Sequence, residues 1–163
     1  MKKLIYTLLI IIALTNNSFS AGSSSDNDST PKMSDYTKAK NLIKAAKKYE
    51  KKGKVEKAQK RYAKAQKLLL KSNKKKPLQA DTLNYLGFTT RKLGDYERGE
   101  QFYLQGLQIE PNHNGINEYL GELYIATNRM DLAKGRLNVL KDCNCKEYNQ
   151  LKEIIEGTKK SKY

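Results

Sequence analysis

Apolar residues recur at three- and four-residue steps along the chain from Tyr36 onward. This spacing gathers them on one face of an α-helix. Within this part of the chain proline occurs only at Pro77 and Pro111, so helices are interrupted by proline at two places. The pattern predicts an all-α protein made of consecutive helices.

Three residues suited to ending a helix divide this helical region in the same way. Gly53, Gly94 and Asn128 have the same spacing to their neighbours. Four residues before each is an aromatic or polar residue (Tyr49, Thr90 and Tyr124), and five residues after each is a small one (Ala58, Gly99 and Ala133). Gly and Asn most readily adopt the left-handed conformation that ends a helix. We therefore predict three helix hairpins, with one of these residues at each turn.

The residues around each break repeat as well. Gly87 and Gly121 both follow a leucine, and they lie 34 residues apart. In the second helix of a hairpin a small residue is followed four residues later by a large one, as in Gly99 and Tyr103. Small residues alternating with aromatic ones allow two helices to approach closely.

This pattern resembles the tetratricopeptide-repeat family, whose 34-residue helical hairpins alternate small and large positions and end in a proline. The middle repeat carries the resemblance best, with Lys92-Leu93-Gly94-Asp95-Tyr96 at its turn and Pro111 at its end. The first repeat is degenerate, because Ala45-Ala46 replaces Leu-Gly and its second helix is longer. The resemblance implies a short α-solenoid of about three repeats with a C-terminal capping helix. We expect a repeat domain over 37–158, with repeats at 39–77, 80–113 and 114–142, a capping helix at 146–157 and a basic tail at 159–163.

The amino terminus has the organisation of a secretory signal. Lys2-Lys3 precedes an apolar run over 4–14, and small Ser18 and Ser20 stand where a signal peptidase needs small side chains. This predicts a signal peptide over 1–20 and an exported protein, periplasmic or secreted; an uncleaved membrane anchor is the alternative. The small and polar residues that follow predict a disordered leader over 21–36.

Charge is distributed very unevenly. The chain has 32 Lys+Arg and 17 Asp+Glu, a formal net charge of +15, and residues 32–76 alone hold 18 basic and 3 acidic residues. Such a segment predicts attraction to anionic lipid or polymer. We predict that Lys47, Lys51 and Lys54 of this segment form a basic patch.

Enzyme chemistry finds little support in the sequence. The chain has no Gly-rich phosphate loop ending in Gly-Lys-Ser/Thr, no His-Glu-x-x-His and no Gly-x-Ser-x-Gly. His113 is the one histidine, and it falls in the turn after Pro111, which favours an exposed loop imidazole over a catalytic base. We therefore predict a protein that is not an enzyme and has no cofactor or resident metal.

The two cysteines, Cys143 and Cys145, stand where the third repeat ends and the capping helix begins. Exported proteins meet oxidising surroundings, which favours a disulfide or a labile redox pair. Two thiolates without a nearby histidine make an incomplete zinc site. Two reduced thiols are the remaining alternative.

The resemblance also implies where a partner would bind, because the first helices of tetratricopeptide repeats line a groove. By this analogy the second repeat would add Asp81 and Lys92 to the groove, and the stripe of Ile43, Phe88 and Ile125 would contact an extended or helical peptide. The groove candidates are Ile43, Lys47, Asn84, Phe88, Arg91, Glu118, Glu122 and Ile125.

Two functions follow from the sequence. The first is a protein-interaction scaffold of the cell envelope that binds a peptide or protein in this groove and is also capable of self-association. The second is an anion-binding module that adheres to an anionic membrane surface or polymer through its Lys-rich first repeat. Specific nucleic-acid binding is not predicted, because the segment is almost all lysine, with Arg61 the one arginine, and few aromatic side chains that could stack on bases.

Overall fold

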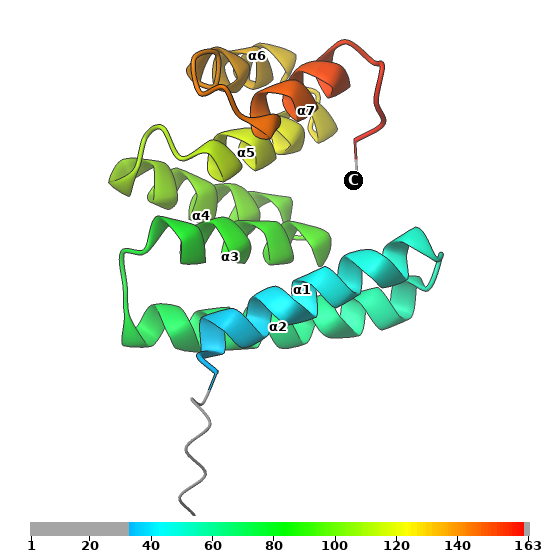
Figure 1. Cartoon of the computed structure of the whole chain (residues 1–163), viewed down its shortest axis with the longest axis vertical. Coiled ribbons are helices and arrows are strands. Elements are labelled where there is room, and N and C mark those ends of the chain that lie inside the picture. The colour runs from blue at the N-terminus through cyan, green and yellow to red at the C-terminus, as the bar shows by residue number, and fades with distance from the viewer. Residues whose placement is uncertain (1–32, 162–163) are drawn as a thin grey trace, which may run out of the picture. The chain divides into compact units, whose positions relative to one another are not determined.

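The computed structural model describes residues 33–161, which form seven α-helices joined by short turns (Figure 1). The predicted signal peptide and nearly all of the predicted leader lie outside these residues. Among residues 33–161, no helix is long and apolar enough to cross a membrane. The helices are α1 (Asp35–Lys51), α2 (Val55–Lys75), α3 (Ala80–Lys92), α4 (Tyr96–Ile109), α5 (Asn114–Ala126), α6 (Met130–Val139) and α7 (Lys146–Ile155).

Consecutive helices pair into hairpins, and the hairpins stack in chain order. Figure 1 shows α1 and α2 at one end, α3 and α4 in the middle, and α5 and α6 together with α7 at the other end. Each second helix packs on the first helix of the next hairpin, as α2 does on α3 and α4 on α5. This is the predicted all-α solenoid of three repeats with a capping helix.

The first helix begins earlier than predicted. Ser34 caps α1, since its hydroxyl oxygen accepts a hydrogen bond from the Thr37 amide at 3.1 Å. Asp35 and Tyr36, assigned to a disordered leader by the sequence, are therefore helical. The leader prediction was wrong at these two positions because Ser34 provides a helix cap and Tyr36 packs edge-on against Tyr85, at 5.9 Å between ring centroids.

The three turns share one hydrogen-bonding pattern. Gly53, Gly94 and Asn128 have φ of +67°, +97° and +58°, as predicted for left-handed helix ends. In each turn this residue donates its amide proton to the carbonyl three residues earlier, and the next amide donates to the carbonyl five residues earlier. These two bonds are the Schellman motif, which satisfies carbonyls that would otherwise lack partners at the helix end.

Small residues bring the helices close together. A Cβ atom added at Gly87 would lie 2.5 Å from the ring of Tyr103, so this ring of α4 packs directly on the backbone of α3. At Gly121 the capping helix supplies the large residue, because Leu151 of α7 would lie 2.6 Å from an added Cβ. Leu151 of the capping helix thus packs on Gly121 as Tyr103 of α4 packs on the equivalent Gly87 in the middle repeat.

Candidate protein-interaction surfaces

The predicted groove residues lie on α1, α3 and α5, but several are inside the protein. Ile43 is 3% exposed and Phe88 is 1% exposed. The Lys47 ammonium lies 4.3 Å from the centre of the Phe88 ring, and the Tyr119 ring is 5.0 Å away, so both side chains cover Phe88. The expectation of an exposed stripe was wrong for Ile43 and Phe88, which are buried, and Ile125 is half-buried.

The charged groove candidates are also buried. Arg91 and Glu122 form an ion pair at 3.6 Å, and neither side chain is exposed to solvent. Arg91 also donates a hydrogen bond to the Tyr119 carbonyl at 2.8 Å, which ties α3 to α5. Asn84 and Glu118 are buried beside them. Arg91 and Glu122 therefore join α3 to α5, since charges removed from water require internal partners. The prediction that these four side chains face a ligand was wrong, because all four are buried.

Half-buried tyrosines occupy the surface that the sequence assigned to the groove, together with one exposed and one half-buried lysine. We call this surface the first-helix face, and define it by Tyr36, Lys40, Lys47, Tyr85 and Tyr119. The Lys40 ammonium lies 5.3 Å from the centre of the Tyr36 ring and 5.9 Å from that of Tyr85. Lys47 donates a hydrogen bond to the Tyr119 hydroxyl at 3.1 Å. The face therefore presents aromatic rings held in place by cations.

Sequence reasoning named Lys47 and missed the tyrosines of this face. A signal for two of them was available, because Tyr85 and Tyr119 lie 34 residues apart and so occupy the same place in successive repeats. Burial raises the pKa of Tyr85 and of Tyr119 above the ordinary tyrosine value. Both phenols consequently keep their protons at neutral pH.

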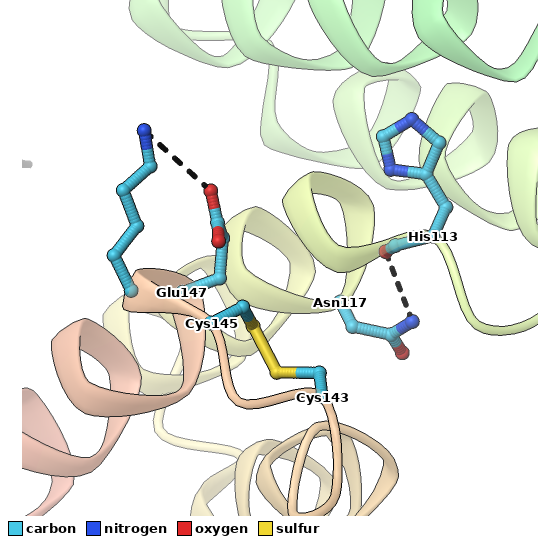
Figure 2. Close-up of a disulfide and its surroundings, with 6 residues drawn as sticks. His113, Asn117, Cys143, Cys145 and Glu147 are labelled. Atoms are coloured by element: carbon cyan, nitrogen blue, oxygen red, sulfur yellow. Dashed lines mark hydrogen bonds and ion pairs between the residues drawn. A yellow bond between two sulfur atoms is a disulfide. The ribbon is translucent and has the colours of Figure 1, made fainter.

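His113 has a structural role at the start of α5. Its Nδ1 atom accepts a hydrogen bond from the Ile116 amide at 3.1 Å, so the ring caps the helix. The proton of the neutral ring is then on Nε2, which donates to an Asp81 carboxylate oxygen at 3.2 Å. The ring is half-buried, and the expectation of an exposed loop imidazole was wrong because this capping bond draws it in. Figure 2 also shows Asn117 donating to the His113 carbonyl.

A disulfide joins Cys143 and Cys145 in the turn between α6 and α7 (Figure 2). The two Cα atoms are 5.2 Å apart, and Asn144 between them has a φ of +45°. Cys145 is the residue that precedes the first turn of α7. Within the part of the chain that the structure describes, no three His, Cys, Asp or Glu residues are grouped as metal ligands.

The predicted basic patch does not form one surface. Lys47 is half-buried on the first-helix face, whereas Lys51 and Lys54 are exposed near the turn between α1 and α2. The larger basic feature lies on α2, where exposed lysines recur at alternating three- and four-residue steps. We call this set the lysine row; it consists of Lys57, Lys60, Lys64, Lys67, Lys71 and Lys74.

No protein-family model matches the chain, and no curated protein matches it. Among solved structures, it is similar to the first TPR of Spaghetti (RPAP3) bound to the HSP90 peptide SRMEEVD. The two share 20% sequence identity over 78% of this chain and 98% of the other, with a TM-score of 0.47. The hairpins, turns and stacking described above define the fold. It is a tetratricopeptide-type solenoid.

Proposed function

We propose that this protein is a non-enzymatic interaction scaffold that binds a peptide or protein segment across the first-helix face. The observation that carries the proposal is the set of Tyr36, Tyr85 and Tyr119, supplied by the first helices of three successive repeats and held by Lys40 and Lys47. Tyrosine is enriched at protein interfaces, because its ring buries a large area at a low cost in conformational entropy.

The chemistry of this face favours one class of segment. The lysine ammonium groups favour carboxylates, and the tyrosine rings favour apolar or aromatic side chains. Asp81 provides a carboxylate beside Tyr36 that accepts a hydrogen bond from His113; its side chain is 70% exposed, so it would also pair with a basic residue of the partner. We infer that the partner segment is mainly acidic and contains aromatic or apolar residues.

The cell envelope is the proposed location. It rests on the Lys2-Lys3 head, the apolar run over 4–14 and the small residues Ser18 and Ser20, which lie outside the described residues. The test is the intact mass of protein recovered from its host, which should correspond to a chain that begins at Ala21. A full-length chain in the soluble cytoplasmic fraction would contradict export.

Photocrosslinking tests the interaction surface. A photoreactive phenylalanine analogue is placed at Lys44, an exposed position on α1 beside the first-helix face, and separately at exposed Leu104 on α4. In the native host, position 44 should crosslink to a discrete protein and position 104 should not. The same crosslinked species at both positions, or none at position 44, would overturn the proposal.

A second function is favoured by the lysine row. Within residues 33–161, no carboxylate lies within 4 Å of Lys57, Lys60, Lys64 or Lys67, so these four ammonium groups are available to external anions. We propose as the alternative that the row adheres to an anionic membrane surface. Binding to phosphatidylglycerol vesicles should then fall steeply as the Debye length shortens from about 10 Å at 0.1 M salt to about 3 Å at 1 M salt. Vesicle binding that is absent, or that ignores salt, would reject this alternative.

A further inference from the structure

The free end of the helix stack carries two clefts between α1 and α2. One has a volume of about 330 Å³ and is lined by Leu42, Tyr49, Lys57, Lys60, Arg61 and Lys64. The other, of about 250 Å³, is lined by Ala45, Lys48, Tyr49, Lys52 and Arg61. We call the surface formed by these two sets of residues the end face. No residue of α3 to α7 lines either cleft. Figure 1 shows α1 and α2 at one end of the stack.

The molecule itself shows how such a surface is covered. The positions of Leu42, Ala45 and Tyr49 in α1 correspond to Leu83, Leu86 and Thr90 in α3. All three α3 residues are buried. They are covered by α2, whose Gln66 donates a hydrogen bond to the Thr90 hydroxyl at 2.8 Å.

The third repeat repeats this arrangement. Its equivalent residues are Asn117, Leu120 and Tyr124, which are buried where α5 packs on α4. In the first repeat Leu42, Ala45 and Tyr49 are only half-buried. The end face is therefore a helix-stacking surface of the same design as the two internal ones, without a helix from residues 33–161 upon it.

Cations surround this apolar strip. Lys48 and Lys52 lie on the α1 side, and Lys57, Lys60 and Lys64 lie on the α2 side, all exposed. Within the described residues none of these five has a carboxylate within 4 Å. Polar residues on a terminal repeat normally keep the solenoid soluble, but that role does not require one sign of charge.

Arg61 is held against the strip. Its guanidinium lies 4.9 Å from the centre of the Tyr49 ring and donates a hydrogen bond to the Tyr49 hydroxyl at 3.4 Å. Arg61 lines both clefts of the end face and adds a further positive charge to the surrounding lysines. A planar guanidinium in a fixed position is suited to binding a carboxylate.

We propose that an acidic amphipathic helix of a partner protein docks on the end face and lies on α1 as α2 lies on α3. The apolar side of this helix would cover Leu42, Ala45 and Tyr49, and its carboxylates would pair with Arg61 and the surrounding lysines. A second copy of the chain is a poor occupant, because each copy carries a net charge of +15. This site is separate from the first-helix face, so its test does not depend on the proposed function.

The probe is a synthetic stapled helix with leucines along one face and glutamates on both sides of them. Its binding to the full chain is measured by fluorescence anisotropy. A variant with Lys48→Glu and Lys60→Glu should bind the probe at least about tenfold more weakly, because two attractions become repulsions. The control, Lys134→Glu with Lys141→Glu on exposed positions near the other end, has the same change in net charge and should bind as the original protein does.

Ala45→Arg separates helix docking from simple charge attraction. The arginine fills the cleft and adds one positive charge, so the probe should lose at least about tenfold in affinity, although an unstructured polyanion such as polyglutamate should bind at least as well. Leu42→Gln, which removes apolar surface without changing charge, should also weaken the probe and leave polyglutamate unaffected. Circular dichroism checks that each variant is folded.

Three results would overturn the proposal. The first is no measurable binding of the probe to the original protein. The second is equal binding of a matched helix in which alanines replace the leucines, which would make the end face a general anion-binding surface. The third is unchanged affinity of the probe for both folded variants, Ala45→Arg and Leu42→Gln.

Discussion

The ring of Tyr103 lies against Gly87, so that a Cβ atom at residue 87 would be 2.5 Å from the ring. Since Tyr103 is fully buried, its ring has little room to move away. Gly87→Ala should therefore destabilise the protein by about 1–3 kcal/mol, the usual cost of overpacking. Urea denaturation followed by circular dichroism measures this change.

The matched control is Gly135→Ala in α6. An added Cβ there meets nothing within 4 Å, and the residue is in ordinary helical conformation. This variant should be more stable by up to about 1 kcal/mol, since alanine favours the helix. Equal effects at residues 87 and 135 would show that helix propensity, and not the Tyr103 ring, decides the outcome.

The turn residues predict a second pair of variants. Gly94 has a φ of +97°, a conformation in which a β-branched residue is strained. Gly94→Val should cost about 1–2 kcal/mol. Asn128→Gly keeps the left-handed conformation accessible at an equivalent turn and should leave stability nearly unchanged. A neutral Gly94→Val in the same denaturant titration would contradict the assigned turn.

Two buried tyrosines differ in what their hydroxyl groups bind. The Tyr62 hydroxyl donates to a Glu50 carboxylate oxygen at 2.8 Å, whereas the buried Tyr103 hydroxyl has no hydrogen-bond partner among the described residues. Tyr62→Phe should therefore cost about 0.5–1.5 kcal/mol, and Tyr103→Phe should be neutral or stabilising. The two free energies of unfolding decide this, and a larger loss for Tyr103→Phe would mean that its hydroxyl has a partner.

Alkaline pH should destabilise the fold through these side chains. Burial raises the pKa of Tyr103 and of Tyr119 above the ordinary tyrosine value. The unfolded chain begins to lose these two protons at about pH 10, whereas the native state still keeps them. Above that pH the unfolded state binds fewer protons, and stability falls as the pH rises; below it the contribution is fully present. Denaturant titrations on both sides of about pH 10 measure the loss.

A control for this pH dependence is again Tyr103→Phe. Because this variant lacks one of the buried phenols, its stability should fall less steeply above about pH 10 than that of the original protein. Phenolate absorbance should show the remaining buried tyrosines ionising together with unfolding. The same slope in both proteins would exclude Tyr103 as a source of the alkaline loss.

The cysteine pair gives a prediction for the protein from its native host. With Cys143 and Cys145 joined, the intact mass under non-reducing conditions should be two hydrogens below that of the reduced chain. Cysteine alkylation without reductant should modify neither residue. Two freely alkylated thiols in freshly isolated protein would show that the pair is reduced there, and bound zinc in equal amount would favour the metal alternative.

The turns could be predicted from the sequence because their cause is local. A left-handed helix end needs a residue such as Gly94 or Asn128, and that requirement is visible in any single chain. The repeat length followed from Gly87 and Gly121, since close helix packing needs a small residue at a fixed place. Both inferences depend on residue type and spacing alone.

The interaction surface could not be predicted in the same way. Whether Phe88 is exposed depends on Lys47 and Tyr119, which come from other helices and close over it. Arg91 and Glu122 were expected in the groove because the resemblance places them at groove-facing positions, and only the packed structure shows that they pair with each other. His113 was misjudged because histidine is not among the usual helix caps, although its Nδ1 atom serves as one here.

Burial is concentrated in α3 and α5, the first helices of the second and third repeats, and eight of the 13 residues of α5 are buried. Ten of the 13 residues of α3 are buried, against three of 17 in α1 and one of 10 in α6. Local opening costs least where few apolar groups are covered, so the outer helices should exchange their amide hydrogens through partial opening while α3 exchanges only when the whole domain unfolds. The protein can therefore loosen at either end, including the end at which we propose that a helix docks, and still keep α3 folded as the surface on which the ends refold.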